Sequence, residues 1–282
     1  MRSFLFVPAD DPRKLAKAAQ SAAHALVLDL EDAVLPERKA AARTLLAEWA
    51  APGDAAARLW VRINEPDSAA LLEDLAAVTP LRPVGVVLPK IRGPEDIGVV
   101  SHYLDMAETI HGIPRGSIKI IAVCTETPSA VLRAHELAQF RCPRLAGLMW
   151  GGEDLSSALG ADDPRTADGS WRPMYQHARN QCLLTARALD VLAIDTVYVD
   201  VKNAEGCRRT ALEARADGFD AKIAIHPDQA VIINEAFTPT AEQRDRAQRI
   251  VEAFAAGRGA VLFEGRMLDI PHLKAARRLL QS

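Results

Sequence analysis

The feature that most constrains the fold of this chain is a repeated alternation of short apolar segments with stretches of helical periodicity. Eight such units follow one another, and several of the helical stretches begin at a proline, where helices commonly start. Strands that are apolar almost throughout are typical of a parallel sheet buried on both faces. The pattern therefore predicts an α/β fold, a closed (β/α)8 TIM barrel. The predicted strands are 3–7, 25–30, 59–63, 85–88, 118–124, 145–150, 193–199 and 221–225.

An open, doubly wound sheet is the competing arrangement for such a pattern. That fold usually carries a glycine-rich turn after its first strand, where the phosphates of a nucleotide bind. Here the corresponding turn, at 8–12, reads Pro-Ala-Asp-Asp-Pro and contains no glycine. The closed barrel is therefore the better prediction.

The segment that follows the eighth unit lies outside the barrel. A long helix is predicted from Pro239 to about Ala256, a glycine-containing break follows it, and a last helix begins at Pro271. We therefore expect a catalytic barrel domain at 1–238 and a C-terminal helical extension at 239–282, which could pack on a neighbouring subunit.

Composition excludes several classes of protein. The 34 Lys and Arg residues against 37 Asp and Glu residues give a net charge of −3, so no nucleic-acid partner is expected. No apolar stretch approaches the roughly 18 residues of a membrane helix, and the N-terminus lacks the apolar core of a signal peptide. The four cysteines form no CxxC pair, which is typical of reduced thiols. We expect no membrane partner and a cytoplasmic location.

Polar side chains follow nearly every predicted strand, at the end where barrel enzymes carry their chemistry. Each of them alone could simply cap a helix or meet solvent where its strand ends. Together they predict a polar site at one mouth of the barrel. In strand order they are Asp29, Glu31 and Asp32; Arg62, Asn64 and Glu65; Lys90; Glu126; Glu153 and Asp154; Asp200 and Lys202; and His226.

Glu126 and Asp154 stand out because both follow very apolar runs on successive strands. Two desolvated carboxylates repel each other unless a cation lies between them. Carboxylates without Cys or His ligands favour a hard ion, Mg²⁺ or Mn²⁺. The histidines show no HxH or HExxH spacing, so a zinc centre is not expected. A metal site is thus one interpretation of the pair, and helix capping is the other.

Cations at the same end of the strands have two interpretations each. Arg62 could bind a carboxylate or a developing enolate oxygen, or it could form a structural salt bridge with the acids that begin at Asp29. Lys90, Lys202 and Lys222 could in principle form Schiff bases. That chemistry is not favoured, because Lys90 is expected in a basic, solvated turn and an imine-forming lysine needs its pKa lowered by desolvation or by a neighbouring cation.

A set of segments in fixed order adds a resemblance to these observations. The segments are 6–14, 27–34, 61–64, 88–90, 125–127, 152–155 and 224–227. Together they resemble the citrate lyase beta-subunit-like family, part of the HpcH/HpaI aldolase superfamily that includes malyl-CoA and citramalyl-CoA lyases, over about Arg2 to Leu280. The resemblance implies a (β/α)8 barrel, Mg²⁺ held by Glu126 and Asp154, and reversible carbon–carbon cleavage of a carboxylated 3-hydroxyacyl thioester.

The resemblance also implies roles for catalytic residues. Arg62 matches the arginine that contacts substrate oxygens, and Asp29 and Glu31 match acids that support the waters of the metal. The segment at 267–271 resembles one through which such lyases lend an aspartate, here Asp269, to a neighbouring subunit of a homotrimer. The position of this aspartate before a proline is equally that of a helix cap.

Residues for coenzyme A follow from the same resemblance. Arg13 and Lys17 of the first helix and His226 match positions near the phosphates or the pantetheine of the coenzyme. On chemistry alone the cations of the first helix could be a solvated face, and His226 could cap the helix that starts beside it. The approach Trp150-Gly151-Gly152 is bulkier than is usual in the family, which bears on the shape of the acyl pocket.

The expected function is therefore a Mg²⁺-dependent lyase that releases acetyl-CoA and a 2-oxo acid from citramalyl-CoA, malyl-CoA or citryl-CoA. A class II aldolase acting on free 2-keto-4-hydroxy acids would need the same metal and no coenzyme. The beta subunit of a citrate lyase complex would act on a carrier-protein thioester. A non-enzymatic barrel would have lost its metal ligands, whereas Glu126, Asp154 and Arg62 are present.

Overall fold

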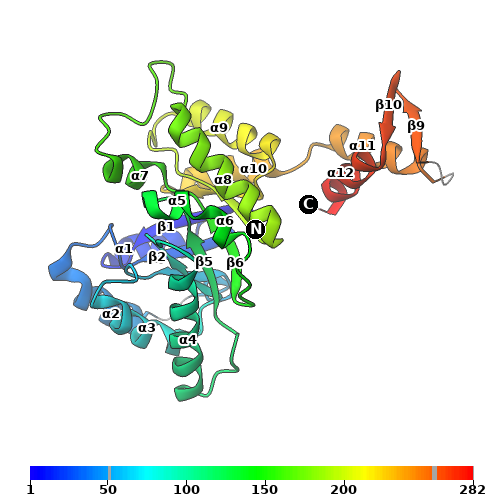
Figure 1. Cartoon of the computed structure of the whole chain (residues 1–282). Coiled ribbons are helices and arrows are strands. Elements are labelled where there is room, and N and C mark those ends of the chain that lie inside the picture. Colours follow the sequence, from blue (N-terminus) through cyan, green and yellow to red (C-terminus); the bar gives the residue numbers. More distant parts are fainter. Residues whose placement is uncertain (50–51, 256–258, 282) are drawn as a thin grey trace. The chain divides into compact units, whose positions relative to one another are not determined.

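Eight parallel strands close into a barrel in which each strand pairs with the next and β8 returns to β1 (Figure 1). The computed structural model describes residues 1–49, 52–255 and 259–281. The predicted (β/α)8 barrel is confirmed. Its strands are β1 (Ser3–Pro8), β2 (Ala25–Asp29), β3 (Leu59–Arg62), β4 (Gly85–Leu88), β5 (Lys119–Val123), β6 (Leu145–Met149), β7 (Leu192–Asp195) and β8 (Ala221–Ala224).

Helices connect the strands, and their ends follow local chemistry. In α1 the carboxylate of Asp11 accepts hydrogen bonds from the backbone N–H groups of Arg13 and Lys14, with Pro12 at the first helical position. In α5 the side chain of Thr127 caps in the same way. The helices are α1 (Pro12–Ala19), α2 (Lys39–Glu48), α3 (Ala70–Val78), α4 (Pro94–Ile110), α5 (Pro128–Leu132), α6 (Ala134–Leu137), α7 (Gly152–Leu159), α8 (Pro173–Leu189), α9 (Ala204–Asp217) and α10 (Pro227–Phe237).

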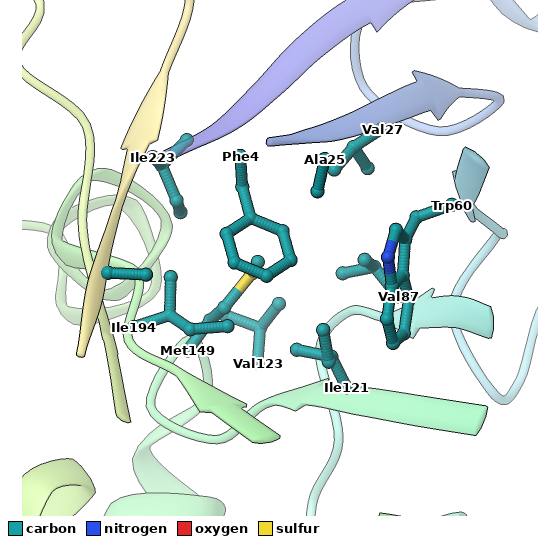
Figure 2. Close-up of a cluster of buried hydrophobic side chains, with 11 residues drawn as sticks. Phe4, Ala25, Val27, Trp60, Val87, Ile121, Val123, Met149, Ile194 and Ile223 are labelled. Atoms are coloured by element: carbon teal, nitrogen blue, oxygen red, sulfur yellow. The ribbon is translucent and has the colours of Figure 1, made fainter. Parts of the chain in front are cut away.

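The interior of the barrel is filled by apolar side chains from every strand (Figure 2). Phe4 and Trp60 meet edge to face with their ring centroids 6.2 Å apart. Gly85 on the neighbouring strand leaves room for the indole, because a Cβ there would lie 2.8 Å from Cε3 of Trp60. Burying one large apolar side chain contributes about 1.5–3 kcal/mol, so this cluster is a principal source of barrel stability.

One predicted strand boundary was wrong in a way that matters for the site. The strand predicted at 193–199 ends at Asp195, so Asp200 and Lys202 do not follow a strand end and lie exposed in the next loop. The apolar run continues beyond Asp195, but Val199 is 52% exposed. An apolar run does not by itself distinguish a strand from a loop that leaves the barrel.

The chain divides into two compact units, Met1–Asn234 and Glu235–Ser282. The second unit contains α11 (Ala241–Ala253), a hairpin of β9 (Ala260–Phe263) and β10 (Arg266–Asp269), and α12 (Ile270–Gln281).

In this second unit a Thr240–Gln243 capping box starts α11. The predicted end of this helix at Ala256 lies outside the described residues. The pairing of β9 with β10 was not predicted. No helix in the described ranges has the length and apolarity needed to cross a membrane.

Candidate active site

A cavity of about 510 Å³ opens at the carboxyl ends of the barrel strands. Seven of the predicted site residues line it, although they come from elements far apart in sequence. They are Lys17 of α1, Asp29 at the end of β2, Arg62 at the end of β3, Glu126 after β5, Glu153 and Asp154 in α7, and His226 after β8. The other polar residues predicted at this mouth of the barrel, Glu31, Asp32, Asn64, Glu65, Lys90, Asp200 and Lys202, are not among its lining residues.

Glu126 lies at the floor of this cavity and is only 4% exposed. One of its carboxylate oxygens accepts a hydrogen bond from the backbone N–H of Lys90 at 2.6 Å. Burial and the negative charge of Asp154 raise the pKa of Glu126 well above its usual range, although Lys90 and Arg62 oppose the shift. A bound cation would reduce the repulsion between these two carboxylates.

A glycine makes the close packing around Glu126 possible. A Cβ on Gly151 would lie 2.7 Å from Cγ of Glu126, and the backbone N–H of Gly151 donates to the hydroxyl of Thr125 at 3.0 Å. The next residue, Gly152, begins α7, which carries Asp154 in its first turn. The positive end of the helix dipole lies there and favours a carboxylate.

Arg62 is held by two acids. Its Nε and Nη2 atoms donate to the two carboxylate oxygens of Asp29 at 2.7 and 2.6 Å, and Nη1 lies 3.0 Å from Glu31. Burial raises the pKa of Glu31, while the charges of Arg62 and Lys90 act against the increase. The predicted salt bridge is thus present. The guanidinium nevertheless lines the cavity, so its pairing fixes its direction without removing it from the site.

Lys90 is not in the basic, solvated turn that was predicted. Its ammonium lies 2.5 Å from Glu31, 2.9 Å from Asp32 and 3.9 Å from Asp154. Burial lowers the pKa of Lys90, but the hydrogen bonds and charges of Glu31 and Asp32 outweigh it, and the net pKa is raised. A raised pKa keeps the amine protonated, which excludes Lys90 as an imine-forming nucleophile.

The residues matched to coenzyme A are divided between two hollows. Lys14 and Lys17 line the main cavity, whereas Arg13 lines an adjacent hollow that shares Pro8, Lys14 and Ala33 with it. His226 lines the main cavity, and its Nδ1 lies 3.3 Å from the backbone N of Asp228 in the first turn of α10. That contact is the one expected of a capping side chain, so His226 both caps the helix and faces the cavity.

Asp269 belongs to the C-terminal unit and ends β10, directly before α12. Its carboxylate lies 2.5 Å from Nδ1 of His272, and both side chains are more than half exposed. Within that unit Asp269 is therefore an accessible carboxylate with an imidazole partner. The histidine was not singled out in the sequence, although its spacing of three residues on a helix start places it beside the aspartate.

A buried network behind the cavity was missed in the sequence. Asp195, at the end of β7, contacts the ammonium of Lys222 at 2.5 Å, the indole N–H of Trp150 at 2.7 Å and Nε of Arg179 at 3.0 Å. The pairing also overturns the possibility of a free Lys222 for imine chemistry. The available signal was an acid inside an apolar run, which the overlong predicted strand concealed.

The glycine- and proline-rich segment at 160–173 contributes one residue to the surroundings of the site. Trp171 packs edge to face against Trp150, with the ring centroids 4.8 Å apart. The guanidinium of Arg165 lies over the other side of Trp171, at 3.7 Å from a ring centroid. A Cβ on Gly152 would lie 2.5 Å from the Trp171 ring, so the loop is packed tightly against the start of α7.

The chain is similar to proteins of a known family. The profile of a family described as HpcH/HpaI aldolase/citrate lyase matches residues 2–227. A citrate lyase subunit beta-like protein of Mycobacterium tuberculosis (strain ATCC 25618 / H37Rv) is 37% identical over 99% of this chain and 94% of its own length. The mitochondrial citramalyl-CoA lyase of Rattus norvegicus is 32% identical over 99% of this chain and 85% of its own length.

A solved structure gives the same relationship in three dimensions. The crystal structure of the CitE protein of Mycobacterium tuberculosis in complex with magnesium, acetoacetate and coenzyme A aligns with a TM-score of 0.84. The two chains are 37% identical, and the alignment covers 99% of this chain and 97% of the other.

Proposed function

The chain belongs to the HpcH/HpaI aldolase/citrate lyase family, and from this premise we propose that it is a Mg²⁺-dependent lyase that cleaves a carboxylated 3-hydroxyacyl-CoA. The observation that carries the proposal is the pairing of a fully buried Glu126 with Asp154 in a cavity that Arg62 also faces. The relatives are named for citrate lyase and for citramalyl-CoA, and one solved relative contains magnesium and coenzyme A.

Glu126 and Asp154 would hold the metal. Within the described residues no three or more His, Cys, Asp or Glu side chains converge as a complete ligand set. Two carboxylates, with water and substrate oxygens completing the coordination, suit Mg²⁺, and Mn²⁺ could replace it. When bound there, the ion supplies Lewis-acid polarisation of the substrate's hydroxyl and carboxylate oxygens.

In the proposed reaction a base takes the proton of the substrate's 3-hydroxyl, its oxygen becomes the carbonyl oxygen of the 2-oxo acid, and the bond between carbons 2 and 3 breaks. The electron pair of that bond passes to the thioester, which gives the enolate of acetyl-CoA, and the remaining fragment leaves as a 2-oxo acid. Arg62, directed by Asp29 and Glu31, would stabilise the enolate oxygen. A proton delivered to carbon 2 then completes acetyl-CoA, and we assign this delivery to Asp269 of a neighbouring subunit in a homotrimer.

The coenzyme would enter past α1. Lys14 and Lys17 line the cavity from this helix, and Arg13 lies over the adjoining hollow, so cations border the route from the site to the surface. Phosphates are bound well by such side chains. With His226 after β8, the strand that pairs with β1, this arrangement favours a CoA thioester over a free 2-keto-4-hydroxy acid, which would need no cationic approach.

Citramalyl-CoA, malyl-CoA and citryl-CoA all fit this chemistry. The test is to incubate each with the protein and Mg²⁺ and to measure acetyl-CoA, free CoA and the 2-oxo acid separately, with an EDTA control. We expect equal amounts of acetyl-CoA and 2-oxo acid from one of them. Release of free CoA without a 2-oxo acid would instead indicate thioester hydrolysis and contradict the proposal.

Two further arms separate the remaining alternatives. Cleavage of free 2-keto-4-hydroxy acids with no action on any thioester would identify a class II aldolase. Action on a carrier-protein thioester alone would identify a beta subunit of a citrate lyase complex. The exposed Glu205 of α9 provides the matched control, because Glu205→Gln makes the same chemical change as Glu126→Gln away from the cavity.

A further inference from the structure

Asp195 is a buried charge that the proposed reaction does not use. It is 3% exposed, and it has three donors, the ammonium of Lys222, the guanidinium of Arg179 and the indole of Trp150. Burial raises the pKa of Asp195, but the charges of Lys222 and Arg179 outweigh it and the net pKa is lowered. The carboxylate is therefore kept ionised although it is buried at the end of β7.

Such a network is costly to build. Removing an aspartate and a lysine from water carries a large desolvation penalty for each ion, and an apolar replacement of similar volume is often as stable. A contribution to stability is thus a weak explanation for the presence of the Asp195–Lys222 ion pair. One of the three donors, the indole N–H of Trp150, is neutral. Because the two cations fix the carboxylate of Asp195, that carboxylate determines where the indole lies. The position of the indole is therefore the better explanation for the network.

The Trp150 indole, held by Asp195, packs in turn against the residues that form the site. Its ring is buried and belongs to the lining of the cavity. A Cβ on Gly152 would lie 3.1 Å from the Trp150 ring, and Trp171 closes the other side of that glycine. The ring therefore sets how far the start of α7 can move.

Both proposed metal ligands depend on that short segment. Gly151 packs directly on Glu126, since a Cβ there would reach within 2.7 Å of its Cγ. Gly152 begins the helix that carries Asp154 in its first turn. A shift of the Trp150 indole would thus change the separation of Glu126 and Asp154 without touching either side chain.

We infer that Asp195 is a positioning residue, which holds the Trp150 indole and through it the Gly151–Gly152 turn that separates the two carboxylates of the site. Lys222 and Arg179 keep Asp195 in place. The inference rests on the proposed function for the identity of the ion that the carboxylates bind. It predicts that loss of the contact between Asp195 and Trp150 weakens metal binding and leaves coenzyme A binding unchanged.

The first experiment compares Trp150→Phe with Trp60→Phe. Both variants replace a buried indole by a phenyl ring. In the described part of the chain the N–H of Trp60 has no hydrogen-bond partner, so this control removes a ring of the same kind without a contact to Asp195. The readout is Mn²⁺ binding followed by electron paramagnetic resonance without substrate, together with the dissociation constant for free coenzyme A.

We expect Trp150→Phe to weaken Mn²⁺ binding by about tenfold or more, the usual effect of losing a group that orients a metal ligand. Trp60→Phe should leave Mn²⁺ binding within about twofold even if it lowers the melting temperature. Coenzyme A binding should stay within about twofold in both variants, since Lys17 and His226 lie on other elements.

A second pair of variants separates positioning from general destabilisation. Asp195→Asn with Lys222→Met removes the ion pair but keeps an oxygen that can accept from the Trp150 indole. Asp195→Leu with Lys222→Met removes that acceptor as well. We expect the first double variant to bind Mn²⁺ nearly as the wild type does and the second to resemble Trp150→Phe.

Two results would be decisive against the inference, and they are distinguishable. If the wild type binds Mn²⁺ and the asparagine and leucine double variants bind it equally well, Asp195 does not position the site and only this inference is overturned. If the wild type itself binds neither Mn²⁺ nor Mg²⁺, the proposed function is overturned and the inference with it.

Discussion

The barrel unit and the C-terminal unit bury their apolar side chains to different depths. In the barrel, Phe4, Val27 and Val87 are completely enclosed (Figure 2). In the C-terminal unit the core residues Ile250 and Leu273 keep 7% and 8% of their surface exposed. A unit of about 50 residues can bury only a small core, whereas a closed barrel of this length has no such restriction.

The two units also differ in how they use charge. The barrel places acids and cations in buried groups with several partners, such as Arg62 with Asp29 and Glu31. In the C-terminal unit Glu264 pairs with Arg246 and Arg249 at the surface. Surface pairs contribute at most about 1 kcal/mol, while buried charges lose much more when a partner is removed. The barrel should therefore respond strongly to single substitutions, and the C-terminal unit weakly.

The largest expected effect is the loss of activity in Glu126→Gln. We expect kcat/KM to fall by about 10³-fold or more, because one of the two proposed metal ligands is lost. Without metal the same variant should melt at a higher temperature than the wild type, since the buried carboxylate and its repulsion by Asp154 are gone. Calorimetry with and without Mg²⁺ checks this. A melting temperature that falls in metal-free buffer would contradict the prediction.

The next prediction tests whether Asp269 of the C-terminal unit acts in the active site of another subunit. Asp269→Asn should lower kcat by about 100-fold, the usual contribution of a proton donor, with an unchanged melting temperature. Mixing this variant with Glu126→Gln should restore part of the activity, because each supplies what the other lacks. Each variant alone at the same total concentration is the control, and no gain on mixing would show that Asp269 does not act between subunits.

A stability comparison makes the difference between the units quantitative. In the barrel, Arg144 is 3% exposed and donates to Glu108 at 2.5 and 2.8 Å, so Arg144→Met should cost about 3 kcal/mol of unfolding free energy. In the C-terminal unit Arg246→Met should cost less than about 1 kcal/mol. Urea titrations measure both. Equal losses would mean that burial does not separate the two units.

The smallest expected effect is a change in the stability of the barrel with pH. Burial raises the pKa of Glu108, but hydrogen bonds from Arg144 and two backbone N–H groups lower it below 4.5 overall, and Arg115 and Arg144 lower the pKa of Asp105 to about 2. A depressed pKa stabilises the folded state above the unfolded pKa and loses this contribution as pH falls. The melting temperature should therefore drop below about pH 4.5, with a smaller drop in Glu108→Gln.

The sequence predicted the barrel because apolar periodicity is a local signal. Most predicted strands end within one residue of the observed ones, and Glu126, Asp154 and Arg62 meet in the cavity as expected. The end of β7 was missed because the apolar run continues past Asp195, whose role depends on partners far away in the chain. The contacts of Lys90 with Glu31 and Asp32 were missed because these acids also lie far from it in the chain.

The C-terminal unit was harder to predict for a different reason. The hairpin pairs Leu262 with Met267 across two strands, and both side chains are largely exposed. Within β10 only Leu268 is buried, so the strand has no clear alternation of apolar and polar residues that a sequence pattern could report. The resemblance to the lyase family identified Asp269, but nothing local pointed to its contact with His272.

The contact between Trp150 and Trp171 gives the protein a built-in optical label. Trp150 lines the cavity and its ring centroid lies 4.8 Å from that of Trp171, whereas Trp49 and Trp60 are not among the lining residues. Emission from Trp150 and Trp171 should follow the occupancy of the site, and emission from Trp49 and Trp60 should stay constant as an internal reference. Binding of ions and acyl groups can therefore be observed in the unmodified chain, with no dye attached and no turnover required.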